Sequence, residues 1–343
     1  MENNIFLTPF LVAFFLALLF LGTIVWVVKN GFVSISGGRL SSRHIHDKKI
    51  SRFGGLAIIL SFILTLFFDK NLMISSQLAG VLIASLAILA VGIFDDIWQL
   101  SWKKQLFFQI ITALFVFFIG IRLEYISNPL GGVFFFTGDV GFVLNLILVV
   151  FWILLISNAM NWVDGVDGVS GGISAIGFLT IFFVSIRPEV NQPPLGIVAM
   201  ALLGSVLAFV IFNFNPAKIL AGTSGSFFMG FILAMLALFA GAKIATTLLV
   251  LAVPVIDALW VIFERLGSGE RIFEADKKHL HYRLLELGWS QRKICLFYWL
   301  VTALIASIAL NVGAFGKLAI FFIIFTLMIV FYFLIRKKTA STV

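Results

Sequence analysis

Long apolar stretches alternate with short polar connections along almost the whole chain. A helix needs ~20 mostly apolar residues to cross the hydrocarbon core of a bilayer, and eleven stretches approach or reach that length. The pattern therefore predicts an all-α polytopic membrane bundle of about eleven spans. No connection is long enough for a soluble domain, so residues 1–343 are expected to form a single membrane domain. The predicted spans are 5–28, 53–68, 77–94, 105–121, 142–157, 169–186, 194–212, 225–240, 244–263, 294–312 and 317–335.

Basic residues are distributed unequally between the two sides of such a bundle. Five alternate connections and the C-terminal tail hold 19 of the 24 lysines and arginines. Because basic connections are retained in the cytoplasm, this distribution predicts that the N-terminus lies outside and the C-terminus in the cytoplasm. The predicted cytoplasmic loops are 29–52, 95–104, 158–168, 213–224 and 264–293.

Composition supports this picture and removes several alternatives. Hydrophobic residues make up 61% of the chain, charged residues 12%, and the mean hydropathy is +1.13, which excludes a soluble globular protein. Topology and attraction to anionic lipid headgroups account for the net charge of +8, so a nucleic-acid partner is not expected. The single cysteine, Cys295, rules out an internal disulfide.

Two predicted cytoplasmic loops carry concentrated carboxylates and amides. Asp95 and Asp96 stand where the third span ends, and a carboxylate pair against an apolar helix is costly unless a cation or hydrogen bonds stabilise it. Solvated acids near the following lysines are an equally open interpretation. In NAMNWVDGVDG, by contrast, Asn158, Asn161 and Asp164 are spaced by three and would share one helix face, with Asp167 close behind. A simple turn would not need four such groups, which favours a functional site.

The segment NFNPAKILAGTSGS offers a different kind of chemistry. Asn-Pro ends a helix, and the glycines with Thr223 and Ser224 could present backbone amides to an anion. The segment lacks the Gly-Lys-Ser/Thr of a Walker loop, so nucleotide hydrolysis of that type is not predicted.

The last cytoplasmic loop predicts a short amphipathic helix that ends at Gly288, with Ser290 capping the next span. His279 and His281 are two residues apart, which argues against a shared zinc ion. With Arg283 they suit phosphate binding, and an interfacial anchor is the alternative. Asp257, inside the ninth span, is either functional or paired with a loop arginine or asparagine.

All these clusters fall on the side assigned from lysine and arginine alone. Carboxylates, amides, lysines and histidines at one membrane border are typical of Mg²⁺-dependent phosphoryl transfer. Mg²⁺ takes oxygen ligands, usually one or two carboxylates together with substrate phosphates.

From about Arg43 to Lys293 the chain resembles the polyprenyl-phosphate N-acetylhexosamine-1-phosphate transferases of glycosyltransferase family 4. NAMNWVDGVDG is very close to the family pattern Asn-x-x-Asn-x-x-Asp-Gly-x-Asp-Gly. The resemblance implies a multi-pass enzyme of the cytoplasmic (inner) membrane, working in cell-envelope glycan synthesis such as lipopolysaccharide or teichoic acid. It would transfer a sugar-1-phosphate from a UDP-sugar to undecaprenyl phosphate in the bilayer, releasing UMP. The implied cofactor is Mg²⁺, with Mn²⁺ as a substitute, and a homodimer is a further expectation.

Matching the family's motifs residue by residue assigns roles as well. The catalytic group implied is Asp95, Asp96, Lys48 and Asp167. The substrate-binding group implied is Asn158, Asp164, Asn213, His279, His281 and Arg283. The metal group implied is Asn161, Asp96 and position 223. His-Leu-His-Tyr-Arg resembles the N-acetylglucosamine branch more than the phospho-MurNAc-pentapeptide branch, which has three consecutive histidines.

Several positions depart from the family pattern. Thr223 stands where a metal-binding aspartate is usual, Gln99 replaces a third acid, Tyr282 replaces a histidine, and Leu220 replaces an aromatic residue. Either the metal site is rebuilt from Asp95, Asp96, Asn161 and Asp164 or Asp167, or activity is weak or absent. We favour the rebuilt site. A transporter or flippase, with ionisable groups along a path through the bilayer, is the hypothesis from another functional class.

Overall fold

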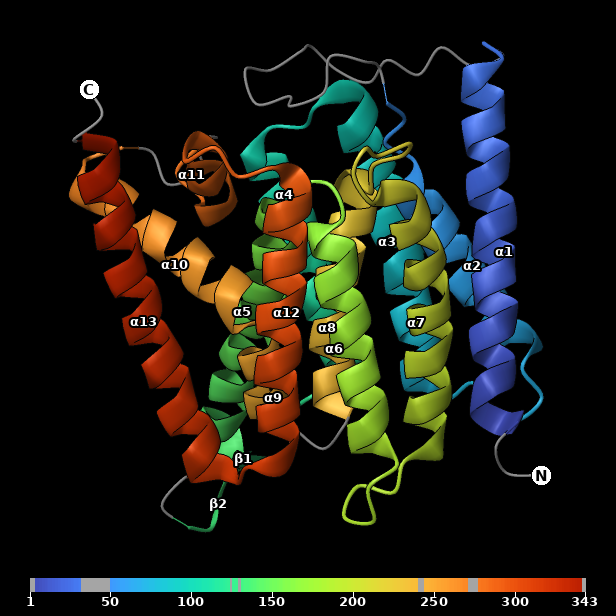
Figure 1. Ribbon diagram of the computed structural model, residues 1–343. Helices are drawn as coiled ribbons and strands as arrows, with labels where there is room; N and C mark the ends of the chain where they lie inside the picture. The colour runs from blue at the N-terminus through green and yellow to red at the C-terminus, as the bar shows by residue number, and fades with distance from the viewer. Residues whose placement is uncertain are drawn as a thin grey trace.

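The computed structural model describes residues 4–31, 50–123, 125–128, 131–239, 244–270 and 277–340. These residues form a bundle of long helices that run side by side (Figure 1), with one short hairpin of two strands. The all-α prediction is confirmed for this part of the chain. The first half comprises α1 (Asn4–Lys29), α2 (Gly54–Phe68), α3 (Ser76–Trp98), α4 (Trp102–Phe118), β1 (Tyr125–Ser127), β2 (Val133–Phe135) and α5 (Gly138–Val163). The second half comprises α6 (Val169–Ser185), α7 (Pro193–Asn213), α8 (Gly222–Phe239), α9 (Ile244–Val250), α10 (Ala252–Gly267), α11 (Leu280–Glu286), α12 (Gln291–Asn311) and α13 (Ala314–Ala340).

Each of the eleven predicted spans coincides with a helical segment. In the described residues, seven helices (α1, α3, α5, α7, α8, α12 and α13) are long and apolar enough to cross a membrane. The bent pair α9 and α10 would make an eighth span, and α2 and α6 are shorter apolar helices. The protein is therefore a multi-pass membrane protein, whereas the count of eleven spans stays a prediction.

The ninth predicted span is not one continuous helix. It divides at Leu251 into α9 and α10, whose axes differ by 78°. Pro254 lies in the first turn of α10, where it has no N–H to donate and where, in a continuous helix, its ring would clash with the carbonyl of residue 250. The segment predicted as a span over 244–263 is therefore a bent pair of helices, and its crossing of the membrane as one span stays a prediction.

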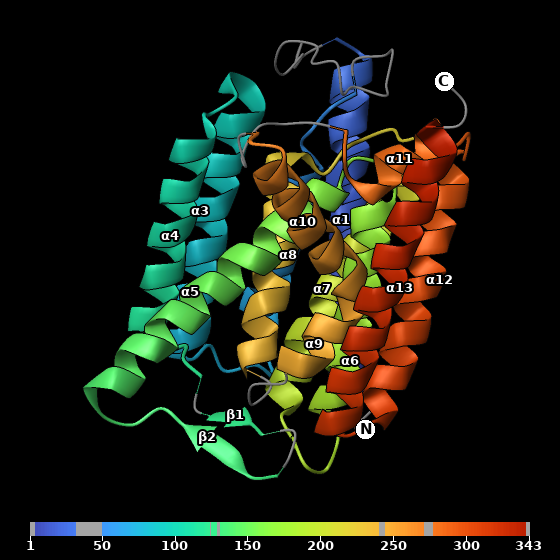
Figure 2. The same ribbon diagram turned by 90° about the vertical axis from the view of Figure 1, so that its left-hand side faces the viewer.

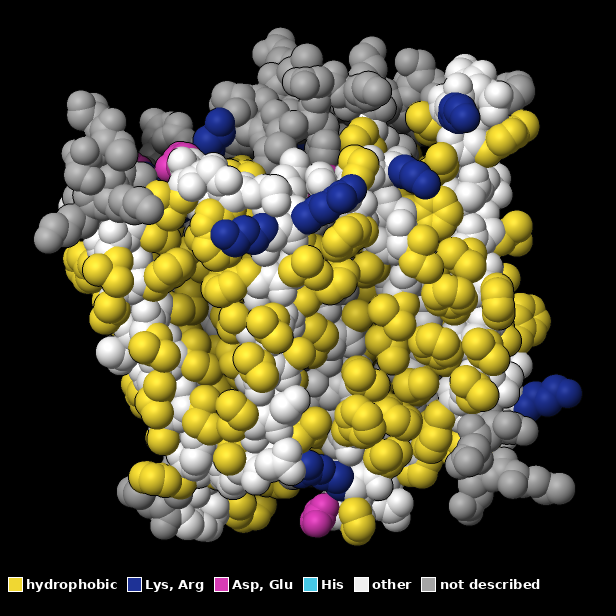
Figure 3. Space-filling view, viewed as in Figure 1, with side chains coloured by type: hydrophobic (Ala, Val, Ile, Leu, Met, Phe, Trp, Pro, Cys, Tyr) yellow, Lys and Arg dark blue, Asp and Glu magenta, His cyan; other side chains and the backbone are white. Residues whose placement is uncertain are grey.

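The connections gather at two ends of the bundle. The N-terminus and the β1–β2 hairpin lie at one end, and the C-terminus, α11 and the α3–α4 turn lie at the other (Figures 1 and 2). Between them the surface is a broad belt of hydrophobic side chains, with Lys and Arg concentrated near the C-terminal end on the face shown in Figure 3. This arrangement agrees with an odd number of crossings, while the assignment of that end to the cytoplasm stays a prediction.

The start of α8 is held tightly among its neighbours. Gly54 and Gly55 donate backbone hydrogen bonds to the carbonyls of Leu220 and Ala221, at 3.0 and 2.9 Å. A Cβ on Gly55 would lie 2.2 Å from the backbone nitrogen of Gly225, so only glycine allows this approach. These contacts fix the N-terminus of α8 against the start of α2, and on α3 a Cβ at Gly92 would lie 2.3 Å from Ser224 Cα, so α3 is equally close where the candidate site begins.

Candidate active site

Asp96 caps the N-terminus of α8 from the last turn of α3. Its Oδ1 accepts a hydrogen bond from the Thr223 amide at 2.9 Å, and its Oδ2 accepts one from the Ser224 amide at 3.4 Å. The free amides and the dipole of a helix N-terminus stabilise a negative charge there. This geometry requires glycine at position 222. Its φ of +69° is unfavourable for residues with a side chain, and a Cβ there would lie 2.5 Å from Asp96 Oδ2. The buried carboxylate of Asp96 is thus paired by hydrogen bonds, as one sequence interpretation required.

Asp95 is held by three neutral donors. Its Oδ1 accepts from the Leu100 amide at 2.8 Å and from Gln105 Nε2 at 2.7 Å, and its Oδ2 accepts from Thr223 Oγ1 at 2.6 Å. Thr223 therefore contacts both aspartates, one through its hydroxyl and one through its amide. Gln105 was missed by the sequence analysis, although a glutamine on an apolar helix is a polar signal of the kind that marks a site.

The C-terminal end of α5 has polar side chains that contact two neighbouring helices, α4 and α8. Asn158 and Asn161 both lie on α5, which continues helically through this segment as expected, but their side chains have partners on two different helices and do not act as one face. Asn161 Nδ2 donates to Ser226 Oγ on α8 at 2.7 Å, which leaves Asn161 Oδ1 for another partner. Asn158 Nδ2 donates to Gln109 Oε1 on α4 at 2.7 Å. Asn161 is therefore placed on the α8 side and Asn158 on the α4 side of the same helix end.

Asp164 follows α5 directly and lies in an acidic environment. Asp164 is half-buried as a whole residue, but protein atoms surround its carboxyl group. This burial raises the pKa of the Asp164 carboxyl to about 7. The hydrogen bond donated by the Ser170 hydroxyl lowers the pKa, the negative charges of Asp96 and Asp167 raise it, and the positive charge of Arg52 lowers it. Arg52 was also missed by the sequence analysis, because it reads as one more basic residue of a cytoplasmic loop.

Asp167 and Asn213 form hydrogen bonds between the 158–168 and 213–224 loops at this end of the bundle. Asp167 Oδ2 accepts from Asn215 Nδ2 at 2.9 Å and from the Ala217 amide at 3.0 Å. Asn213 Oδ1 accepts from the Gly168 amide, and Asn213 Nδ2 donates to the Ile219 carbonyl, both at 2.9 Å. These bonds join the 158–168 and 213–224 loops, so both residues position backbone in the described structure.

His279, the N-cap residue of α11, and His281, in its first turn, meet the 158–168 loop from the other side. His279 lies beside Trp162, with ring centroids 5.8 Å apart, and the His279 and His281 rings are stacked at 5.8 Å. His281 is fully buried, and a Cβ on Gly165 would lie 2.2 Å from its Nε2. Burial, and next the neighbouring His279, lower the pKa of His281 to about 3, whereas Asp257 raises it. Gly165 is therefore needed for the loop to approach α11.

Arg283 and Asp257 are both engaged with other charged groups. An Arg283 guanidinium nitrogen lies 2.5 Å from Glu264 Oε2, and Arg283 Nε donates to the Lys278 carbonyl at 2.7 Å. Asp257 Oδ2 lies 2.9 Å from His279 Nδ1. Of the two sequence interpretations of Asp257, pairing is observed, but its partner is a histidine and not an arginine or asparagine.

The described structure thus brings most of the predicted residues to one end of the bundle. The 158–168 loop is the centre, with Asp95, Asp96 and Thr223 on one side and the histidines on the other. Lys48 lies outside the described residues. No three His, Cys, Asp or Glu side chains converge as a complete metal site within the described ranges.

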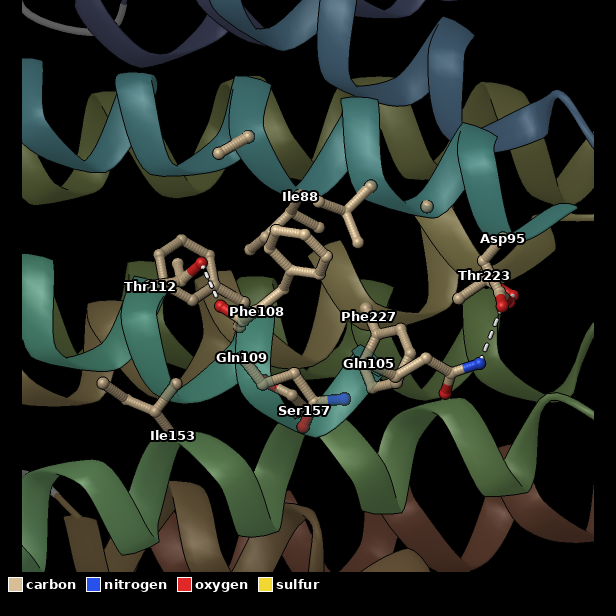
Figure 4. A pocket seen from close by; sticks show the side chains of 14 residues that line it. Ile88, Asp95, Gln105, Phe108, Gln109, Thr112, Ile153, Ser157, Thr223 and Phe227 are labelled. Carbon is tan, nitrogen blue, oxygen red and sulfur yellow. Dashed lines mark hydrogen bonds between the residues drawn. The ribbon is translucent and has the colours of Figure 1, made fainter. Parts of the chain in front are cut away.

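An apolar pocket begins at the aspartate end of this cleft. It encloses about 510 Å³ of space, including the part open to its surroundings, between α3, α4, α5 and α8. Figure 4 shows Asp95 and Thr223 at one end and Thr112 and Ile153 at the other. The walls are mainly apolar, with Ile88, Phe108, Ile153 and Phe227 among them. The pocket therefore leads from a carboxylate cluster into the membrane part of the bundle.

Comparisons with known proteins agree with this geometry. The model of glycosyl transferase family 4 matches residues 78–241, the part that holds α3, α4, α5 and α8. The chain is similar to a probable undecaprenyl-phosphate N-acetylglucosaminyl 1-phosphate transferase of Bacillus subtilis, with 30% identity over 93% of this chain and 89% of that protein. The chain belongs to glycosyl transferase family 4.

Two further members of family 4 show its breadth. A decaprenyl-phosphate N-acetylglucosaminephosphotransferase of Mycobacterium leprae is 31% identical over 81% of this chain and 78% of its own length. A phospho-N-acetylmuramoyl-pentapeptide-transferase of Bacillus anthracis is 30% identical over 78% of this chain and 86% of its own length. Both branches anticipated from the sequence are thus represented among its relatives.

Proposed function

We propose that this protein transfers N-acetylhexosamine-1-phosphate from a UDP-sugar to undecaprenyl phosphate at the cytoplasmic face of the inner membrane. The observation that carries the proposal is the pocket that joins Asp95 to the apolar interior of the bundle. A substrate with a phosphate head and a long apolar chain suits such a site, because its head meets polar groups while its chain stays out of water. The names of the relatives support a polyprenyl phosphate as the acceptor, undecaprenyl phosphate in one and decaprenyl phosphate in the other, and an N-acetylglucosamine phosphate as the transferred group.

The reaction is a single phosphoryl transfer. An oxygen of the lipid phosphate forms a bond to the sugar-bearing phosphorus of the donor, and the bond from that phosphorus to UMP breaks. UMP leaves with the bridging oxygen, and the product is a polyprenyl-diphosphate-sugar. A lipid phosphate is largely ionised at neutral pH, so positioning and charge neutralisation carry most of the catalysis. Asp95, fixed by three donors at the mouth of the pocket, is the residue that would orient the acceptor and accept a remaining proton.

The oxygen-rich end of the cleft fits a Mg²⁺ ion that is completed by substrate. Asn161 keeps its Oδ1 free of the Ser226 hydrogen bond, and Asp164 lies three residues further on. Mg²⁺ commonly takes one or two protein carboxylates plus phosphate oxygens, so a full protein cage is not required. We assign Asn161, Asp164 and Asp96 to this ion, which would neutralise charge on the diphosphate when bound. Thr223 then serves as a hydrogen-bond donor to Asp95 and not as a metal ligand.

The histidine side of the cleft is assigned to the donor. His279 lies at the end of the cleft opposite Asp95, next to Trp162. An imidazole can donate to phosphate oxygens there, and Arg283 lies one helical turn further on α11. A transporter would need ionisable groups along a path through the bilayer, and Asp257, which lies within the ninth predicted span, is instead paired with His279.

The test is UMP release by purified protein in lipid nanodiscs with undecaprenyl phosphate and Mg²⁺. We expect release from UDP-N-acetylglucosamine and formation of a lipid-linked sugar diphosphate, detected by mass spectrometry. Asp95→Asn is the control and should lower turnover at least 100-fold while the protein stays folded. UDP-MurNAc-pentapeptide is the competing donor, and a preference for it would assign the protein to the phospho-MurNAc-pentapeptide branch. Absence of turnover with every UDP-sugar in folded wild-type protein would contradict the proposal.

A further inference from the structure

A buried set of hydrogen bonds connects the last helix of the chain to His279. Asp257, on α10, is 1% exposed and accepts three hydrogen bonds. His279 Nδ1 lies 2.9 Å from Asp257 Oδ2, the Leu280 amide donates to Oδ1 at 2.8 Å, and the Tyr332 hydroxyl of α13 donates to the same Oδ1. The proposed reaction uses His279 but gives no role to either Asp257 or Tyr332.

We propose that Asp257 and Tyr332 are positioning residues that hold His279 through Nδ1, so that Nε2 is the ring nitrogen presented to the phosphate groups of the donor. This inference rests on the proposed function, because it concerns the donor side of the same cleft. It also extends the working site to α13, which lies beyond residues 78–241, the part that the family model matches.

The chemistry of the carboxylate decides which histidine nitrogen carries the proton. An ionised carboxylate only accepts hydrogen bonds, so Nδ1 of His279 must carry the hydrogen that faces Asp257. Nε2 is then the nitrogen left for a ligand, and it donates a hydrogen bond to a phosphate oxygen once the ring carries a second proton there, with Nδ1–H kept on Asp257. The ring cannot turn freely, because it also stacks on His281 with an interplanar angle of 6° and lies against Trp162. A carboxylate that orients a histidine in this way fixes both its tautomer and its direction.

Tyr332 is itself held in place by its surroundings. Its side chain is 1% exposed and its ring stacks on Trp260, with centroids 5.3 Å apart. The Arg283 guanidinium lies 5.0 Å from the Tyr332 ring centroid. The hydroxyl therefore reaches Asp257 from a ring that two neighbours fix, and removal of the hydroxyl alone should leave this packing intact.

Tyr298, on α12, provides a matched control. It is also a fully buried tyrosine, and within the described residues its hydroxyl has no hydrogen-bond partner. Tyr332→Phe and Tyr298→Phe make the same chemical change at two buried sites of one protein. Only the first removes a donor from the carboxylate that holds His279.

The first experiment compares the kinetics of Tyr332→Phe, Tyr298→Phe and wild type in nanodiscs. We expect Tyr332→Phe to lower kcat/KM for the UDP-sugar about tenfold, the usual effect of losing a hydrogen bond to a charged group. The KM for undecaprenyl phosphate should not change, because the acceptor binds at the Asp95 end. Tyr298→Phe should stay within about twofold of wild type. Equal behaviour of the two variants, or equal loss for both substrates, would overturn the inference.

The second experiment does not depend on activity. The chain has only four histidines, so selective ¹⁵N labelling gives few signals, and His279→Gln identifies the one of interest. Long-range ¹H–¹⁵N correlation should show the hydrogen on Nδ1 of His279 in wild type and in Tyr298→Phe. Asp257→Asn should shift the signal toward the other tautomer. A hydrogen on Nε2 alone in wild type would refute the positioning role, whereas absent turnover in wild type with the expected tautomer would refute only the proposed function.

Discussion

Thr223 shows how a single neutral residue shapes the acidic end of the site. Its hydroxyl donates to Asp95 and its amide donates to Asp96, so two neighbouring carboxylates share one residue as a donor. The family pattern has an aspartate at this position, but an aspartate side chain has no hydrogen to donate when ionised. The local structure therefore favours a site rebuilt around Thr223 over a degraded one.

Thr223→Asp tests this interpretation. The new carboxylate would face Asp95, whose Oδ2 now lies 2.6 Å from Thr223 Oγ1, and two like charges at such separation repel strongly. We expect UMP release to fall at least 100-fold and thermal stability to fall as well. Thr223→Ser, which keeps the hydroxyl, should retain activity within about threefold. A large gain of turnover in Thr223→Asp would show that the native site is degraded.

His281 predicts a dependence of stability on pH. Its pKa is lowered to about 3 in the folded protein, against about 6.5 for an unperturbed histidine. Between these values the unfolded chain binds a proton that the folded chain does not, so folding stability falls as the pH falls below about 6.5. From pH 7.5 to 5.5 the loss from this group should be about 1.4 kcal/mol. His281→Leu should lose less stability over the same range in thermal melts, and an identical pH dependence in both proteins would exclude this role.

For single residues, the sequence predicted which polar side chains lie near one another but not which partner each one contacts. The clusters around Asp95, Asn161 and Asp164 were predicted as one site from topology alone. The use of Asp96 as a cap for α8 could not be predicted, because it depends on contact between residues 127 positions apart. Gln105 and Arg52 were missed for the same reason: their importance lies in partners from other helices.

The packing of helix ends is what positions the site at the scale of elements. α2 and α8 approach through Gly55 and Gly225, and α3 approaches α8 through Gly92, where a Cβ would lie 2.3 Å from Ser224 Cα. Three helix ends thus meet with backbone against backbone. Because this contact is so close, the Asp96 carboxylate of α3 reaches the amides of α8 and the Asp95 carboxylate reaches the Thr223 hydroxyl.

Gly55→Ala should therefore separate α2 from α8. The added methyl group has no space, and overpacking of this kind typically costs about 1–3 kcal/mol. We expect a lower melting temperature and a loss of turnover greater than the loss of stability alone would cause. Gly22→Ala on α1 is the control, because nothing lies within 4 Å of its added Cβ. Equal melting temperatures for the two variants would contradict the proposed contact.

Local chemistry allowed several element boundaries to be predicted. Gly288 has a φ of +80° after α11, and Ser290 accepts a hydrogen bond from the Lys293 amide at 3.3 Å at the start of α12. Both features follow from the residues themselves. The break between α9 and α10 was not predicted, because the apolar pattern of 244–263 continues through it and the turn signal of Pro254 was not used.

The whole molecule has its polar chemistry at one end and an apolar belt around its middle. α11, the α3–α4 turn and the C-terminus share that end, opposite the N-terminus (Figures 1 and 2). The count of lysines and arginines predicts that this end faces the cytoplasm.

Cysteine labelling tests the orientation. The only native cysteine, Cys295, is buried, and Cys295→Ala gives a background without thiols. Glu189→Cys, exposed between α6 and α7, should react with a membrane-impermeant maleimide in intact cells. Glu286→Cys, exposed on α11, should react only after the membrane is opened. The reverse pattern would invert the proposed topology.

The hydrogen bonds of Asp257 have a consequence for the order of biosynthesis. The ribosome completes Asp257 22 residues before His279 and 75 residues before Tyr332. During membrane insertion the Asp257 carboxylate therefore lacks the hydrogen bonds of His279 and Tyr332 until those residues have been made. A cell that inspects nascent membrane proteins for polar groups in the bilayer can thus recognise, at this residue, a chain in which α13 has not yet been inserted. Only the insertion of α13 brings the Tyr332 hydroxyl to Asp257.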